Sequence, residues 1–124
     1  MLYVIVFLGA GIGGALRHGV NTASARLFGL DFPYGTLIVN IAGSFLMGVL
    51  AGWFLARPGI AQNLRLFLTT GILGGFTTFS AFSLDSALLI ERQAYWLAAA
   101  YVAGSVVASL AALFAGLALT RAAA

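Results

Sequence analysis

Residues 71–83 read Gly-Ile-Leu-Gly-Gly-Phe-Thr-Thr-Phe-Ser-Ala-Phe-Ser and lie within a hydrophobic stretch long enough to cross a membrane. Glycines followed by hydroxyl residues and phenylalanines are a poor composition for an unbroken, lipid-facing helix. A break at membrane depth frees backbone groups, and it is tolerated only where protein or a water-filled pathway receives them. Broken helices of this kind recur in proteins that move ions or small solutes. The segment therefore predicts a permeation site.

The composition is that of an integral membrane protein. Of the 124 residues, 62% are hydrophobic and 7% are charged, whereas a soluble domain has about 25% charged residues. The chain has no cysteine, which excludes disulfides and thiolate metal sites. The basic residues are scattered and form no run with interleaved aromatic residues, so no nucleic-acid partner is expected. The lipid bilayer is the expected environment, and the cell (inner) membrane is the expected location.

Four hydrophobic spans predict an all-α fold in which residues 1–124 form a single four-helix membrane domain. The predicted spans are Leu2–Val20, Tyr34–Ala56, Leu64–Ile90 and Ala94–Thr120, joined by Asn21–Pro33, Arg57–Asn63 and Glu91–Gln93. The third span is too long, because a straight helix at about 1.5 Å per residue would reach about 40 Å across a hydrocarbon core of about 30 Å. Either it tilts strongly or it is broken, and Gly71, Gly74 and Gly75 favour a break near the midplane.

The arginines are divided equally between the two ends of the predicted spans. Arg17, Arg26 and Arg92 fall on one side, and Arg57, Arg65 and Arg121 fall on the other. The positive-inside rule therefore has no excess on which to act. Either some other factor sets the orientation, or copies insert both ways up. The second interpretation predicts dual topology and an antiparallel homodimer, which would also enclose a pathway better than four helices alone.

Polar side chains form a stripe on the second span. Thr36, Asn40 and Ser44 are spaced by four residues, so they share one face of a helix. Asn40 lies well inside the span, where an unpaired amide is costly. It either makes an interhelical hydrogen bond, a common use of Asn in membranes, or it lines a pathway. Beside a broken third span, the pathway interpretation is favoured.

Aromatic and hydroxyl residues follow the glycines of the third span. Phe79 and Phe82 are three residues apart and share a helix face. Such pairs usually pack in a core, but the edge of an aromatic ring carries partial positive charge that an anion can approach. Thr77 and Ser80 add hydroxyls that can donate to an anion. Carbonyls freed around Gly74–Thr77 are an alternative site for a hard cation such as Na⁺.

Further polar residues lie on the fourth span and near the end of the third. Tyr101 and Ser105 are four residues apart and add two hydroxyls to one face. Asp85 is either a helix-end residue or a vestibule residue. Catalysis finds no support, because His18 is the sole histidine and the sequence has no nucleophile–base pair, metal-ligand spacing or phosphate loop. The chain is therefore not expected to be an enzyme.

With these residues in view, the chain resembles the small fluoride channel family, Fluc, also called CrcB. The resemblance covers almost the whole chain and rests on residues 13–17 (Gly-Gly-Ala-Leu-Arg), 35–40 (Gly-Thr-Leu-Ile-Val-Asn) and, most specifically, 74–83 (Gly-Gly-Phe-Thr-Thr-Phe-Ser-Ala-Phe-Ser). It implies an antiparallel, dual-topology homodimer with two fluoride pores and a central structural Na⁺. It also implies passive export of fluoride, which would lower fluoride toxicity in the cytoplasm.

The resemblance also implies roles for individual residues. The backbone carbonyls of Gly74 and Thr77 match the family's Na⁺ ligands, and Arg17 matches a vestibule arginine. The positions of the fluoride pathway are matched by Asn40, Phe79, Phe82, Ser80, Tyr101, Ser105 and Thr36. Two residues depart from the family pattern, since Ala81 replaces a common Thr and Asp85 replaces a common Glu. Both changes fall on or near the implied pathway.

Two other classes of protein share some of these features. Small multidrug-type exporters also have four helices and dual topology, but their proton coupling requires an acidic residue in the first helix. Leu2–Val20 contains no Asp or Glu, which counts against this class. A small assembly or anchoring subunit would explain the close glycine spacing but would leave the polar and aromatic stripes without a purpose.

Overall fold

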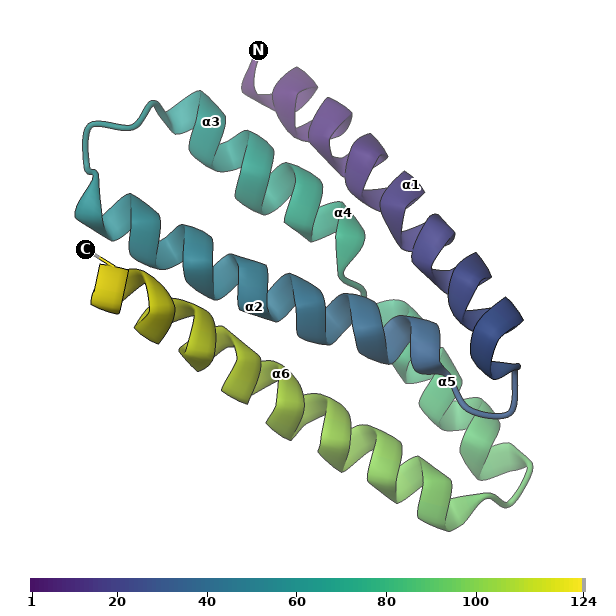
Figure 1. Cartoon of the computed structure of the whole chain (residues 1–124). Helices are drawn as coiled ribbons and strands as arrows, with labels where there is room; N and C mark the ends of the chain where they lie inside the picture. The colour runs from purple at the N-terminus through teal and green to yellow at the C-terminus, as the bar shows by residue number, and fades with distance from the viewer. Residues whose placement is uncertain (124) are drawn as a thin grey trace.

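The computed structural model describes residues 1–123, which are helical apart from short connections and contain no strand (Figure 1). Ala124, the last residue of the predicted domain, lies outside the described residues. The elements are α1 (Leu2–Phe28), α2 (Tyr34–Ala56), α3 (Gln62–Leu66), the π-helical η1 (Phe67–Leu73), α4 (Gly74–Phe76), α5 (Phe79–Glu91) and α6 (Tyr95–Ala123). Four helical stretches are long and apolar enough to cross a membrane, namely Leu2–Phe28, Tyr34–Ala56, Gln62–Glu91 and Tyr95–Ala122. The prediction of an all-helical membrane protein with four spans is confirmed.

The first helix is longer than predicted. The link was expected to start at Asn21, but α1 continues to Phe28. The polar residues after Val20 do not interrupt a helix, because none of them fixes a non-helical backbone. The helix ends at Gly29, whose φ of 83° lies in a region that favours glycine. The second helix begins and ends at the predicted residues.

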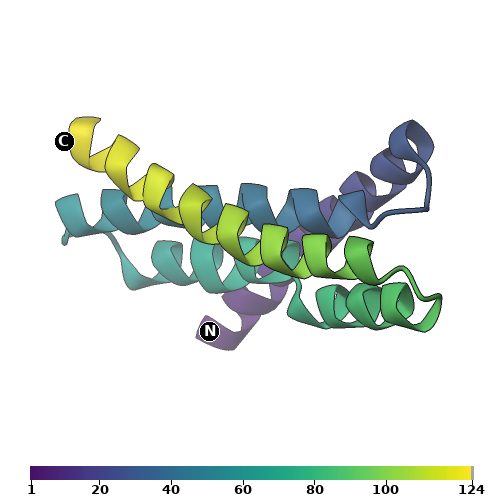
Figure 2. The same ribbon diagram turned by 90° about the horizontal axis from the view of Figure 1, so that it is seen from below.

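Glycines bring the helices into close contact. α2 packs along α6, and the two lie side by side in Figures 1 and 2. A Cβ atom on Gly48 of α2 would collide with the carbonyl oxygen of Leu113 on α6, so the two backbones touch. In the same way, a Cβ atom on Gly13 of α1 would collide with the carbonyl oxygen of Ile72. Small residues at such contacts allow dispersion forces to hold helices together in lipid.

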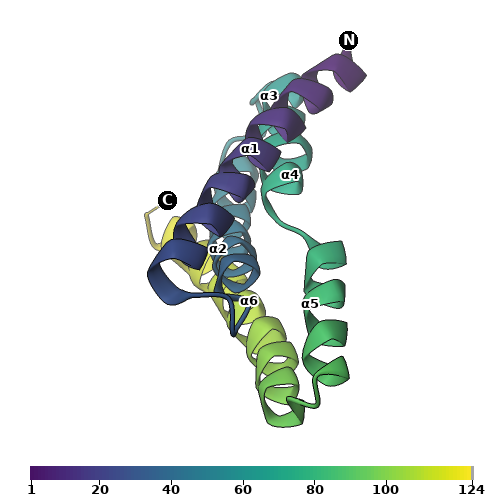
Figure 3. The same cartoon turned by 90° about the vertical axis from the view of Figure 1, so that its right-hand side faces the viewer.

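The third span is assembled from four helical segments and one extended dipeptide. α3, η1 and α4 follow one another without a gap, and the glycines of this region are helical. Thr77 (φ −85°, ψ 158°) and Thr78 (φ −153°, ψ 124°) then adopt extended backbone before α5 begins. Figure 3 shows the ribbon changing course between α4 and α5. The non-helical backbone thus falls on the two β-branched threonines, just after the glycines expected to supply it.

The ends of the molecule carry different connections. The α1–α2 loop and the α5–α6 turn lie at one end, and the α2–α3 connection lies at the other with the C-terminal end of α6 (Figures 1 and 2). A small core at the first end contains Leu89, Ala98 and Tyr101. Elsewhere large apolar side chains face outward; Tyr3 is 91% exposed and Trp96 is 89% exposed. An apolar outer surface of this kind suits a lipid environment.

Candidate functional site

A groove of about 330 Å³, here called the central groove, lies where α2, α6 and the start of α5 meet. Four residues predicted to line a pathway, Asn40, Phe79, Phe82 and Ser105, line this groove together. The polar stripes continue along it through Ser44 and Ser109, and Thr77 and Thr78 border it as well. The extended dipeptide and both polar stripes therefore meet at one place.

Asn40 pairs with the backbone of Thr78 through both ends of its amide. Its Nδ2 donates to the Thr78 carbonyl at 3.0 Å, and its Oδ1 accepts from the Thr78 N–H at 2.8 Å. In a continuous helix that N–H would donate to the carbonyl of Gly74. The Asn40 side chain thus replaces a helical hydrogen bond and satisfies backbone groups that the extended conformation leaves free.

The side chain of Thr78 starts α5. Its Oγ1 accepts a hydrogen bond from the Ala81 N–H at 3.1 Å, the usual contact of an N-cap threonine. In a continuous helix this N–H would donate to the carbonyl of Thr77. The same Oγ1 lies 3.2 Å from Oγ of Ser80, and either atom can donate. Ser80 is therefore placed beside the cap, but it is exposed and does not line the central groove.

The two phenylalanines have different surroundings. Their ring centroids are 5.5 Å apart at an interplanar angle of 47°. Phe82 also packs on Tyr101, with 5.2 Å between ring centroids, and joins the small core. Phe79 is 78% exposed. A role in packing within this chain therefore fits Phe82 but does not account for Phe79.

Tyr101 is bonded to Asp85. The tyrosine side chain is 1% exposed, and its hydroxyl donates to Oδ2 of Asp85 at 3.1 Å. A buried tyrosine normally finds such a partner. The sequence indicates a polar role for each residue but not their pairing, since they lie on different helices. Asp85 is not simply a helix-end residue, because it closes one side of the aromatic cluster around Tyr101.

Ser105 carries an unpaired hydroxyl. The residue is 5% exposed, and its Oγ has no hydrogen-bond partner in the part of the chain that the structure describes. Leaving a buried hydroxyl unpaired costs about 1–3 kcal/mol. Since Ser105 lines the central groove, its hydroxyl is available to a small polar species that enters the groove.

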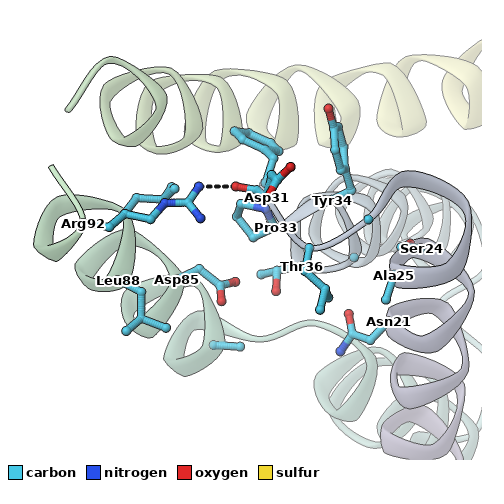
Figure 4. Close-up of a pocket in the computed structure, with 16 residues that line it drawn as sticks. Asn21, Ser24, Ala25, Asp31, Pro33, Tyr34, Thr36, Asp85, Leu88 and Arg92 are labelled. Carbon is cyan, nitrogen blue, oxygen red and sulfur yellow. Dashed lines mark hydrogen bonds between the residues drawn. The ribbon is translucent and has the colours of Figure 1, made fainter. Parts of the chain in front are cut away.

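A second cavity, here called the end chamber, lies under the α1–α2 loop and has a volume of about 360 Å³ (Figure 4). Thr36 and Asp85 line this chamber and not the central groove, and Figure 4 shows their side chains pointing toward each other. Thr36 lies one helical turn before Asn40, and Asp85 follows Phe82 by three residues. The two cavities are therefore adjacent along both α2 and α5, and Tyr101 contacts the lining of both, Asp85 in the chamber and Phe82 in the groove.

Other residues of the end chamber were not identified from the sequence. Asn21 and Ser24 come from the last turns of α1, Asp31 comes from the loop, and Arg92 caps α5. Their only sequence signal was the density of polar residues in the predicted link and turn. They come together because α1 extends past Val20 and because the α1–α2 loop folds over α5.

Arg17 lies apart from this arrangement. It lines neither the central groove nor the end chamber, and its Nε is buried without a hydrogen-bond partner among residues 1–123.

The predicted cation ligands are backbone atoms, and no cluster of three His, Cys, Asp or Glu side chains exists among the described residues. The carbonyls of Gly74 and Thr77 have lost their helical N–H donors, because the N–H of Thr78 donates to Asn40 and the N–H of Ala81 donates to the Thr78 hydroxyl. This donor set fits a hard monovalent cation.

Comparison with known proteins gives a consistent family relationship. A family described as "CrcB-like protein, Camphor Resistance (CrcB)" matches residues 4–117. A protein of Rhodopseudomonas palustris (strain BisB5) named "Fluoride-specific ion channel FluC" is 59% identical over 122 residues, which cover 98% of each chain. A protein of Methylobacterium nodulans with the same name is 64% identical over 118 residues, covering 95% of this chain and 94% of the relative. A third, from Granulibacter bethesdensis, is 54% identical over 121 residues.

Proposed function

The chain belongs to the CrcB-like protein family, and from this premise we propose that it is a fluoride-selective channel. The observation that carries the proposal is the full-length identity of 59–64% to relatives named as fluoride-specific ion channels. Transport is passive and runs from the cytoplasm outward across the cell membrane. Export lowers the concentration of fluoride in the cytoplasm and therefore its toxicity.

The chemistry of the central groove supports this cargo. Fluoride is small and strongly hydrated, so a pathway must replace its water with close donors. The groove offers the unpaired hydroxyl of Ser105 and the ring edges of Phe79 and Phe82. The polar series continues past Asn40 to Thr36 and Tyr101, and the hydroxyl of Ser80 lies 3.2 Å from Oγ1 of the groove residue Thr78. None of these groups carries a positive charge that would trap the anion.

We propose that the working unit is an antiparallel homodimer of oppositely inserted copies. Arg26 and Arg92 lie at the end of the molecule that carries the α1–α2 loop. Arg57 and Arg65 lie at the opposite end, where Nη2 of Arg65 donates to the carbonyls of Arg57 and Pro58. Positive charge is thus present at both ends, as dual topology requires. The exposed ring of Phe79 borders a groove that one chain leaves open, and a second copy is the occupant that would enclose it.

The third span acts in this proposal as a broken helix with a structural Na⁺ at the dimer centre. The carbonyls of Gly74 and Thr77 have lost their helical donors and are the proposed ligands. Two antiparallel copies would present four such oxygens. Neutral carbonyls suit Na⁺ better than a divalent ion, which prefers carboxylates. Arg17, with its buried and unpartnered Nε, is assigned to a vestibule that forms only in the dimer.

Efflux from liposomes tests the function. Purified protein is reconstituted, and the release of fluoride and of chloride is followed side by side, with and without a pH gradient. We expect downhill, charge-moving fluoride efflux without a pH gradient and little chloride efflux. Comparable chloride release would refute selectivity. Strict dependence on a proton gradient would instead favour a small multidrug-type exporter, although α1 contains no acidic residue.

A further inference from the structure

The end chamber has an unusual charge balance for a cavity on an anion pathway. Two carboxylates line it, those of Asp31 and Asp85, and both repel an anion. Among residues 1–123, the only cationic side chain that lines it is that of Arg92. The other charged residues near this end lie outside the lining; Glu91 is exposed on the last turn of α5, and Arg26 lines an adjoining hollow that shares Asn21, Ala25 and Leu30 with the chamber. Entry of an anion through this chamber therefore depends on one guanidinium.

Arg92 is held in place by the backbone of the loop. It follows the last residue of α5, where its N–H donates to Leu88, and its Nη2 donates to the carbonyl of Asp31. Figure 4 shows the side chain reaching across to the loop, with the bond marked. Because its partner is a neutral carbonyl, this bond does not neutralise the guanidinium. The positive charge is thus fixed at the rim of the chamber.

The chamber lies next to the central groove along α2 and α5, although the two cavities share no lining residue. Thr36 and Asp85 line the chamber, and each is within one helical turn of a groove residue, Asn40 and Phe82. The Tyr101 hydroxyl donates to Asp85 at 3.1 Å and the Tyr101 ring packs on Phe82, so this residue contacts the lining of both cavities. The end chamber is therefore the next cavity toward the α1–α2 loop for an ion that leaves the groove. This step rests on the proposed function, because it takes the groove as the fluoride pathway.

We propose that the end chamber is a mouth of the fluoride pathway and that Arg92 is its anion-collecting residue, with Asp31 as the opposing charge. Arg92 raises the local concentration of anions at the rim, and Asp31 lowers it. In water, one unit charge at about 10 Å changes the local concentration of a monovalent ion by about twofold, and low-dielectric walls increase the effect. The balance of the two side chains therefore sets how often fluoride enters.

The test measures fluoride efflux from liposomes at two ionic strengths. Potassium gluconate is varied from about 0.01 M to about 1 M, over which the Debye length falls from about 30 Å to about 3 Å. Arg92→Gln should lower fluoride efflux about threefold at low ionic strength, and the charge-dependent part of the loss should disappear at high ionic strength. Arg92→Lys keeps the charge and should retain most of the wild-type efflux.

Two further variants keep the test decisive. Asp31→Asn removes the opposing charge without touching the carbonyl that Arg92 binds, and it should raise fluoride efflux at low ionic strength. The Asp31→Asn variant tests the proposal even if the Arg92→Gln variant fails to assemble. Arg26→Gln removes the same charge from the same end, but its side chain does not line the chamber, so its loss of efflux at low ionic strength should be smaller than that of Arg92→Gln.

Three results would overturn the proposal. One is an equal loss in Arg92→Gln and Arg92→Lys at every ionic strength, which would make the contact with the loop purely structural. The others are an unchanged efflux in an assembled Arg92→Gln variant and an unchanged efflux in Asp31→Asn. In each case the wild type still transports fluoride. A wild type that transports no fluoride would instead refute the proposed function itself.

Discussion

Asn40 and Thr78 are joined by two hydrogen bonds, of 3.0 and 2.8 Å, although 38 residues separate them in the sequence. The pair connects α2 to the extended dipeptide between α4 and α5. It explains how the backbone of the buried Thr78 can leave the helical conformation within a membrane span. The same amide borders the central groove, so one side chain both supports the backbone and contributes to the lining.

Asn40→Leu should therefore reduce both stability and transport. Leucine has nearly the same size but leaves the Thr78 N–H and carbonyl unpaired, at about 1–3 kcal/mol for each buried group. We expect a clearly lower melting temperature for the purified protein and at least a tenfold loss of fluoride efflux, equivalent to about 1.4 kcal/mol in the barrier. Ser44→Ala is the matched control, because it alters the same groove face without touching Thr78. Wild-type stability in Asn40→Leu would contradict the supporting role of Asn40.

Substitutions of Phe79 and Phe82 should distinguish a role in packing from a role in fluoride transport. Isoleucine keeps an apolar side chain but removes the ring quadrupole. Phe82→Ile should lower both the melting temperature and fluoride efflux, because the Phe82 ring packs on Tyr101 at 5.2 Å. Phe79→Ile should lower efflux at least tenfold, about 1.4 kcal/mol, while leaving the folding of the single chain unaffected, because Phe79 is 78% exposed. Efflux near the wild-type level in both variants would leave packing as their only role.

Tyr101→Phe tests the contact between the two cavities. The substitution keeps the ring, which also meets Phe32 edge-on at 5.5 Å, and removes the hydroxyl that donates to Asp85. We expect the fold to persist and fluoride efflux to fall, because the carboxylate of Asp85 loses a donor and repels the anion more strongly. Asp85→Asn removes that repulsion. In the double variant, efflux should therefore recover toward that of Asp85→Asn alone. Independent, multiplicative effects of the two substitutions would show that the pair does not act as a unit.

Patterns within single helices made part of this site predictable from the sequence. The four-residue spacing of Thr36, Asn40 and Ser44 placed them on one face of α2, and the structure puts Asn40 and Ser44 in the central groove. The glycine-rich segment indicated non-helical backbone, but the structure places it on Thr77 and Thr78. Helix propensity alone could not locate it, because the Asn40 side chain and the Thr78 cap determine which residues are extended.

Contacts between helices could not be predicted in the same way. The Tyr101–Asp85 bond depends on how α5 packs on α6, and the Arg92–Asp31 bond joins residues 61 apart. No periodicity in the sequence encodes these distances. The polar residues after Val20 predict a loop, but α1 continues to Phe28, because a helix that leaves the hydrocarbon core can remain helical in the interface. The end chamber was missed for both reasons.

The proposed cation site can be tested on the unaltered protein by exchanging the cations in solution. The carbonyls of Gly74 and Thr77 have lost their helical N–H donors to Asn40 and to the Thr78 hydroxyl, so in an antiparallel dimer they would point four oxygens at one site. Such oxygens repel one another unless a cation lies between them, and neutral carbonyls favour a monovalent ion. Prolonged exchange of Na⁺ for the bulky N-methylglucamine cation should therefore lower fluoride efflux and the thermal stability of the dimer. Restoring Na⁺ should recover both, and Mg²⁺ should not. Full efflux and an unchanged melting temperature after exhaustive exchange would refute a structural role for Na⁺, because the carbonyls would then need no counter-charge.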